Sequence, residues 1–234
     1  MNIFEAWASG DDRSVIFDFN GTLSNDEPLL VVLFQELFME YLDWPLSDEE
    51  YFSDLAGRSD REIIESAVEA RAPGDHQLVE TLMRERRLRY LDLVERRSPI
   101  EDDTVAMVDA LRSANVPLAI VTGAQRIDVE FVLRHRGLGE VFSAIVTEED
   151  VSHGKPDPEG FLLGAALLGT EPADALVFED SLYGIRSAKA AGMRCVGVVG
   201  TSSAEELSRE ADAVVEALGP WLIPSLDEGS SAAS

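Results

Sequence analysis

Cysteine is nearly absent from this 234-residue sequence, in which Cys195 is the single example. One thiol cannot form an internal disulfide, and this favours a reducing compartment. The first residues, MNIFEAWASGDDR, lack the basic start and the apolar run of a signal peptide. No stretch approaches the roughly 18 apolar residues that a membrane span requires. The sequence therefore predicts a cytoplasmic protein.

Basic residues are also scarce. The 19 Lys and Arg face 45 Asp and Glu, which leaves a formal net charge of −26 at pH 7, and only Lys155 and Lys189 are lysines. A field of this sign repels a phosphodiester backbone or an anionic lipid surface, so we expect neither a nucleic-acid nor a membrane partner. The hydrophobic fraction of 45% is large enough for a full core and excludes a disordered chain.

Short apolar runs alternate with helical patterns over most of the chain. The β-branched and aromatic run Ser14–Phe19 predicts a buried strand. Further strands are expected at Val116–Val121, Ala144–Thr147, Ala175–Phe178 and Arg194–Val199, and helices at Asp103–Ala114, Gln125–Arg136, Pro158–Gly169 and Leu182–Ala191. A weaker unit follows at about Ala204–Val215. This alternation is typical of βαβ units and of a parallel sheet covered on both faces.

The stretch between Asn25 and Ser98 contains no strand-like run. Helical spacing of apolar residues instead predicts helices at Glu27–Leu42, Ser47–Leu55, Asp60–Ala70 and His76–Arg97. We therefore expect an all-helical insertion at residues 25–98 in an α/β core formed by residues 1–24 and 99–224. The small, polar tail at 225–234 is expected to be disordered.

Polar residues follow the ends of the predicted strands. Asp18 ends the first strand, Thr122 and Gly123 end the next, Glu179 and Asp180 follow Ala175–Phe178, and Lys155 lies in a loop. Ligands of parallel α/β sheets bind beyond the carboxyl ends of the strands, so these residues are expected to share one pocket. Two carboxylates suit a hard cation such as Mg²⁺, which also accepts substrate phosphate and water. The lysine would neutralise charge, and the threonine would bond a phosphoryl oxygen.

Four segments together resemble the motifs of the haloacid dehalogenase (HAD) superfamily: DFNGTL, VTG, GKPDPE and FEDSLYGIRSAKAAGM. The sequence looks most similar to the β-phosphoglucomutase-like branch, which has a helical cap after the first motif, and the resemblance spans Val15 to about Val199. It implies a Rossmann-like core with an inserted helical cap. It also implies a Mg²⁺-dependent phosphatase that acts on a small phosphorylated metabolite through an aspartyl-phosphate.

The resemblance implies roles for individual residues. Asp18 matches the nucleophile and first metal ligand, Thr122 the hydroxyl that binds the phosphoryl group, and Lys155 the lysine of the third motif. Asp180 matches a metal carboxylate, with Glu179 as a ligand or as a neighbour of one. The predicted contacts to the substrate are completed by Gly21, Thr22, Gly123 and Arg58.

Asn20 departs from the family pattern. Its main-chain carbonyl remains available to the metal, but the family's phosphatases and mutases usually have an Asp here that acts as general acid and base. An amide cannot exchange a proton at neutral pH, whereas a general acid contributes roughly 10²–10⁴-fold. Several explanations stay open: a slow phosphatase, a substrate with a good leaving group, another proton donor, an engineered substitution, or a phosphometabolite-binding protein with little turnover.

Other chemistries of the superfamily agree less well with the sequence. Phosphonate cleavage uses a cap lysine, and residues 25–98 contain no Lys. Haloacid dehalogenases lack the acidic FED stretch that is present at 178–180. A phosphosugar mutase needs the general acid even more than a phosphatase does, so Asn20 disfavours this alternative.

Arginines of the expected cap give two further expectations. Arg58 lies at a break between helices, where it either clamps a second phosphate or carboxylate of the substrate or pairs with Asp60 or Glu62. A solvated helix face is expected for Arg84, Arg86, Arg87 and Arg89.

Overall fold

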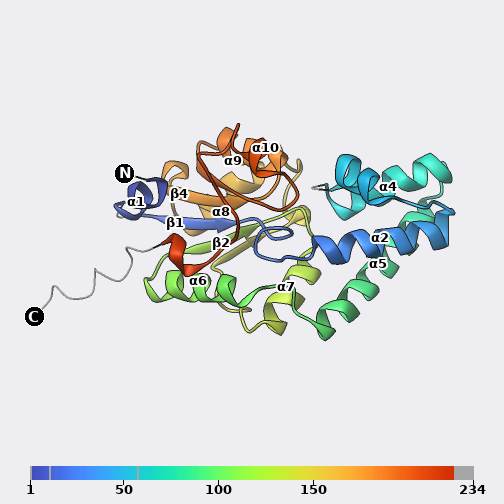
Figure 1. The fold of residues 1–234 in the computed structure, drawn as a ribbon, viewed down its shortest axis with the longest axis horizontal. Coiled ribbons are helices and arrows are strands. Elements are labelled where there is room, and N and C mark those ends of the chain that lie inside the picture. Colours follow the sequence, from blue (N-terminus) through green and yellow to red (C-terminus); the bar gives the residue numbers. More distant parts are fainter. Residues whose placement is uncertain (1, 11, 57, 224–234) are drawn as a thin grey trace, which may run out of the picture.

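A parallel sheet forms the centre of the molecule (Figure 1). The computed structural model describes residues 2–10, 12–56 and 58–223, so the predicted disordered tail lies outside the described residues. The strand order is β3-β2-β1-β4-β5-β6, and all pairs are parallel. The strands are β1 (Ser14–Phe17), β2 (Leu118–Val121), β3 (Ala144–Val146), β4 (Ala175–Glu179), β5 (Arg194–Val198) and β6 (Ala213–Val215). The predicted Rossmann-like α/β fold is confirmed.

Helices cover both faces of this sheet, which explains why its strands are apolar on both sides. Val15 and Phe17 join one buried cluster with α6 and α7, whereas Ile16 joins a second cluster with α8, α9 and α10. Cys195 belongs to the second cluster and is buried, as expected. The five helices are α6 (Asp102–Ser113), α7 (Arg126–His135), α8 (Glu159–Leu168), α9 (Leu182–Ala190) and α10 (Ala204–Leu207).

Between β1 and α6, the regular elements of the described residues are all helices, and Figure 1 shows this segment beside one end of the sheet. Helices α2, α4 and α5 pack on one another. The bounds are α2 (Glu27–Leu42), α3 (Asp48–Glu50), a π-helical turn η1 (Tyr51–Leu55), α4 (Asp60–Arg71) and α5 (His76–Arg96). The expected helix at Ser47–Leu55 is therefore two short pieces rather than one regular helix.

Helix α1 (Ile3–Ala8) was not expected from the sequence. It is six residues long, too short for a periodic pattern, and a capping box between Asn2 and Glu5 starts it. Trp7 anchors it, because the buried indole N–H donates to the carbonyl of Ser14 at 3.0 Å. The described residues also form the 3₁₀ turns η2 (Glu148–Asp150), η3 (Pro172–Asp174) and η4 (Pro220–Leu222). Within the described ranges, every helix is too short or too polar to cross a bilayer.

Arg86 of α5 does not lie on a solvated helix face, contrary to the expectation from the sequence. Its side chain is buried, whereas Arg84 is exposed and Arg87 and Arg89 are half-buried. The Arg86 guanidinium lies 2.9 Å from Asp60 of α4, contacts Asp128 of α7, and stacks over the ring of Tyr90. The expectation was wrong because these carboxylates belong to distant segments and leave no sign in the pattern of α5.

Candidate active site

A pocket of about 510 Å³ lies at the carboxyl ends of the central strands. The core contributes most of the predicted site residues to its wall, and the helical segment contributes Arg58. The predicted residues in the wall are Asp18, Asn20, Arg58, Thr122, Gly123, Lys155, Glu179 and Asp180. The structure therefore brings together residues as far apart in the sequence as Asp18 and Asp180.

Lys155 lies between two carboxylates. Its Nζ is 2.5 Å from Oδ1 of Asp18 and 2.7 Å from Oε2 of Glu179. Burial lowers the pKa of Lys155, but the two carboxylates outweigh this effect and raise it, so the ammonium is charged at neutral pH. Burial, followed by the charge of Glu179, raises the pKa of Asp18, while Lys155 lowers it. A fixed cation therefore lies directly beside the predicted nucleophile.

Three buried carboxylates gather at this point. Asp18, Glu179 and Asp180 each offer an oxygen, and these oxygens lie within 4.8 Å of one another. Lys155 balances one of the three charges, and hard oxygen ligands of this kind suit a divalent cation such as Mg²⁺. The pKa of Asp180 is raised to about 7, first by burial and then by the charge of Glu179. The donor set therefore fits the expected metal.

Close backbone approach positions Asp180. The N–H of Thr201 donates to its Oδ2 at 2.9 Å. Gly21 has a φ of +76°, and a Cβ at this position would lie 2.0 Å from the same oxygen. Thr22 is buried, and its hydroxyl approaches the other carboxylate oxygen at 3.5 Å. Gly21 and Thr22 thus lie against Asp180 and outside the pocket wall, and their contact with substrate stays a prediction.

Glu179 uses both of its oxygens within the protein. Oε2 contacts Lys155, while Oε1 accepts hydrogen bonds from the hydroxyl and the N–H of Ser181, at 2.7 and 3.1 Å. Gly184 provides the space, because a Cβ there would lie 1.9 Å from the carboxyl carbon. This arrangement favours Glu179 as a neighbour of the metal ligands, which orients Lys155, over a direct ligand.

Thr122 follows β2 and is tied to β3, because its N–H donates to the carbonyl of Val146 at 2.9 Å. Its Oγ1 accepts the N–H of Ala124 at 3.1 Å, which leaves the hydroxyl proton free to donate into the pocket. Gly123 comes next, and a Cβ there would lie 3.8 Å from that of Ser59. The helical segment and the core therefore approach each other closely at this loop.

The side chain of Asn20 is engaged by the protein itself. Its amide donates to Oδ2 of Asp26 at 2.6 Å, and the hydroxyl of Tyr90 donates to the same oxygen at 2.5 Å. Asp26 has no exposed surface; burial raises its pKa to about 6, although the hydrogen bonds from Tyr90 and Asn20 lower it. This arrangement could not be predicted from the sequence, because Tyr90 comes from α5, 64 positions after Asp26.

Arg58 lines the pocket but is exposed, and its guanidinium donates to the main-chain carbonyls of Asp54 and Glu62, at 3.4 and 3.2 Å. Asp60, one of its expected partners, pairs with Arg86 instead. Gly57, at the same break between helices, lies outside the described residues.

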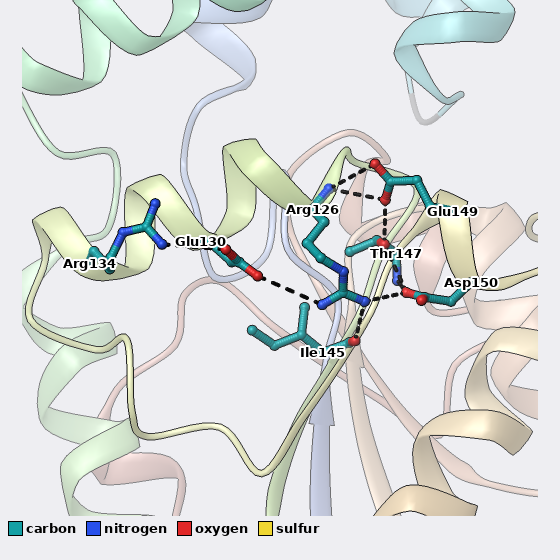
Figure 2. Close-up of polar contacts among 7 residues, drawn as sticks. All are labelled: Arg126, Glu130, Arg134, Ile145, Thr147, Glu149 and Asp150. Carbon is teal, nitrogen blue, oxygen red and sulfur yellow. Dashed lines mark hydrogen bonds and ion pairs between the residues drawn. The ribbon is translucent and has the colours of Figure 1, made fainter.

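The loop after β3 is a part of the site that sequence reasoning missed. Figure 2 shows Arg126, at the start of α7, bonded to Asp150 at 2.5 Å and to the carbonyl of Ile145 at 3.0 Å. The hydroxyl of Thr147 donates to Glu149 at 2.5 Å, and Glu149 in turn accepts the N–H of Arg126. This network holds the loop that brings Thr147 and Glu148 to the pocket wall.

Residues 15–198 match the family model of the haloacid dehalogenase-like hydrolases. The chain belongs to this family. The resemblance to the HAD superfamily and the prediction of a hydrolase are therefore confirmed. Among similar proteins, validoxylamine A 7′-phosphate phosphatase of Streptomyces hygroscopicus subsp. limoneus is 34% identical over 88% of this chain and 94% of its own length. Fructose-1-phosphate phosphatase YqaB of Escherichia coli is 32% identical over 79% of this chain and 95% of its own length.

Solved structures agree with this assignment. CbbY from Rhodobacter sphaeroides, in complex with phosphate, superposes with a TM-score of 0.77 at 26% identity, over 91% of this chain and 95% of its own. A putative β-phosphoglucomutase from Thermotoga maritima gives a TM-score of 0.70 at 26% identity, over 93% of this chain and 99% of its own. The expected likeness to the β-phosphoglucomutase-like branch is confirmed.

Proposed function

We propose that the protein is a Mg²⁺-dependent phosphatase that hydrolyses a small phosphorylated metabolite through an aspartyl-phosphate on Asp18. The observation that carries this proposal is the buried Asp18 carboxylate, which lies beside Lys155 and close to the carboxylates of Glu179 and Asp180. The names of the relatives support it, since two of them are a validoxylamine A 7′-phosphate phosphatase and a fructose-1-phosphate phosphatase.

Each residue has a role in this reaction. Asp18 attacks phosphorus, Lys155 stabilises the charge on the transferring group, and Thr122 bonds a phosphoryl oxygen. Asp18, Asp180 and the main-chain carbonyl of Asn20 would hold Mg²⁺, with Glu179 beside them. When bound, the metal supplies positive charge that neutralises the phosphate and orients it.

The helical segment completes the pocket in this proposal. Residues 25–98 act as a cap on a core formed by residues 1–24 and 99–224, and cap closure excludes bulk water. Gly123 and Arg58 are proposed to contact the substrate where core and cap meet, and Gly21 and Thr22 to support it from the nucleophile loop. The cytoplasmic location expected from the sequence stays a prediction.

A generic aryl phosphate tests the function, because an aryl leaving group needs little help from an acid. We expect the protein to hydrolyse p-nitrophenyl phosphate with Mg²⁺, and we expect EDTA or Asp18→Asn to abolish turnover. Lys189→Met is a control, because this lysine pairs with Asp212 outside the pocket. Tight Mg²⁺-dependent phosphate binding without turnover would instead support the phosphometabolite-binding alternative, and transfer of phosphate between sugar hydroxyls would support the mutase.

A further inference from the structure

The pocket contains a carboxyl group that the proposed reaction leaves without a role. Most acidic residues of the wall are engaged within the protein: Asp18 and Glu179 by Lys155, Asp180 by Thr201, Asp60 by Arg86, Glu62 by Ser59 and Asp157 by Glu159. Glu27 and Glu148 also line the pocket, and neither takes part in an ion pair within the described residues. Glu27 differs from Glu148 in having a buried oxygen, Oε1, without a hydrogen-bond partner.

The location of Glu27 connects it with the nucleophile loop. It is the first residue of α2 and follows Asp26, the partner of the Asn20 amide. Asp26 itself cannot reach a substrate, because it has no exposed surface and is not part of the pocket wall. His153 lines the pocket, but its side chain is 73% exposed and faces Glu159. Glu27 is thus an acid of the pocket wall without an ion-pair partner, and it directly follows the residue that binds the Asn20 amide.

The surroundings of Glu27 keep a proton on it near neutral pH. Its pKa is raised to about 7, first by burial and then by the charges of Asp26, Asp60 and Asp18, whereas a hydrogen bond with Tyr51 lowers it. The pKa of the Tyr51 hydroxyl is strongly raised, so Tyr51 itself is a poor acid and does not give its proton to a leaving group. A carboxylic acid that titrates near the working pH is suited to give and take a proton in turn.

We propose that Glu27 is the general acid and base of this enzyme, in place of the absent Asp at position 20. The inference rests on the proposed phosphatase function. As Asp18 bonds to phosphorus, the bond from phosphorus to the leaving oxygen breaks, and that oxygen takes its electron pair and the Glu27 proton to become an alcohol. The Glu27 carboxylate then removes a proton from the water that attacks the aspartyl-phosphate. This step releases inorganic phosphate and restores Asp18 and protonated Glu27.

Two substrates of similar shape test the proposal. Benzyl phosphate releases a strongly basic alkoxide that needs a proton, whereas p-nitrophenyl phosphate releases a weakly basic phenolate. We expect Glu27→Gln to lower kcat/KM for benzyl phosphate about 100-fold and for p-nitrophenyl phosphate less than about threefold. The p-nitrophenyl activity also shows that the variant is folded. In the wild type, kcat/KM for benzyl phosphate should fall as pH rises through the pKa of Glu27, and this limb should be absent in Glu27→Gln.

Two further variants separate proton transfer from binding. Glu148→Gln removes the other unpaired acid of the wall and should change kcat/KM for both substrates by the same factor. Asn20→Asp combined with Asp26→Asn exchanges the acid and the amide while keeping their hydrogen bond. Added to Glu27→Gln, this pair should restore hydrolysis of benzyl phosphate at least tenfold, because it returns an acid to position 20.

Three results would overturn the proposal: equal losses on both substrates in Glu27→Gln, a selective loss in Glu148→Gln instead, or no rescue by the exchanged pair. A wild type that hydrolyses p-nitrophenyl phosphate but not benzyl phosphate would also overturn it, since no donor would then be present. Absence of p-nitrophenyl phosphate turnover in the wild type is a different failure, because it contradicts the phosphatase function itself.

Discussion

At the scale of single residues, Glu148 shows how the pocket disfavours negative charge. It lies at the start of the turn after β3 and lines the pocket. Its pKa is raised to about 7, first by burial and then by the charges of Asp60 and Glu149, while Arg61 and Gln125 lower it. The ordinary pKa of a glutamate side chain, which serves as the value for the unfolded chain, is 4.5. The folded protein therefore binds this proton more tightly than the unfolded chain does.

This difference makes stability depend on pH in a definite direction. A carboxyl group whose pKa is higher in the folded protein contributes stability at pH values below its pKa in the unfolded chain. This contribution is lost as the pH rises through its pKa in the folded protein. Glu148→Gln removes this dependence while keeping the shape of the side chain. We therefore expect the Tm of Glu148→Gln to exceed that of the wild type at pH 8, with little difference near pH 4, measured by thermal denaturation in EDTA. An equal gain at both pH values would show that ionisation of Glu148 is not the cause.

At the scale of elements, Arg86 joins three helices. Its guanidinium connects α5 to Asp60 of α4 and to Asp128 of α7, and the Arg86 side chain is only 3% exposed. Removing one member of a buried ion pair leaves the other charge without compensation and typically costs about 3–5 kcal/mol. We expect Arg86→Met to lower the free energy of unfolding by about this amount in urea denaturation.

Arg84→Met is the matched control, because Arg84 lies on the same helix and its side chain is 65% exposed. This change should shift the free energy of unfolding by less than about 0.5 kcal/mol. Similar losses in the two variants would mean that helix propensity, rather than the buried pairs, determines the effect at Arg86.

Most of the elements could be predicted from the sequence, because their patterns are local. Apolar strands of four to five residues, such as Ala175–Glu179, and helices with clear caps, such as α4, are visible in windows of about ten residues. α1 was missed because its six residues are too few for a period, and it is held by the hydrogen bond of Trp7 to Ser14 at the start of β1. Arg86 was misplaced because its partners come from α4 and α7.

At the scale of the whole molecule, the candidate site was predictable where its residues end strands. The order of the parallel strands brings Asp18, Thr122 and Asp180 to one edge, and this follows from the βαβ pattern. The pocket face of the helical segment was not predictable, because Glu27 looks like any acidic residue in the first turn of a helix. Its relation to Asn20 depends on the hydrogen bond between Asn20 and Asp26, which no sequence pattern indicates.

The net charge of −26 acts on the molecule as a whole. Repulsion among excess carboxylates destabilises the compact state, while exposed ion pairs such as Arg61–Glu65 contribute about 0–1 kcal/mol each. Salt screens both effects, and the Debye length falls from about 30 Å at 0.01 M to about 10 Å at 0.1 M. The long-range repulsion is therefore weakened more than the buried contacts of Arg86.

Added salt should consequently stabilise this protein. We expect the Tm at pH 7.5 in EDTA to rise by several degrees between 10 and 200 mM NaCl, because the compact state has far more negative than positive charge to screen. KCl should give the same increase as NaCl, since screening depends on ionic strength rather than on the cation. A Tm that stays constant or falls would mean that the local ion pairs, including Lys155 with its two carboxylates, outweigh the net repulsion.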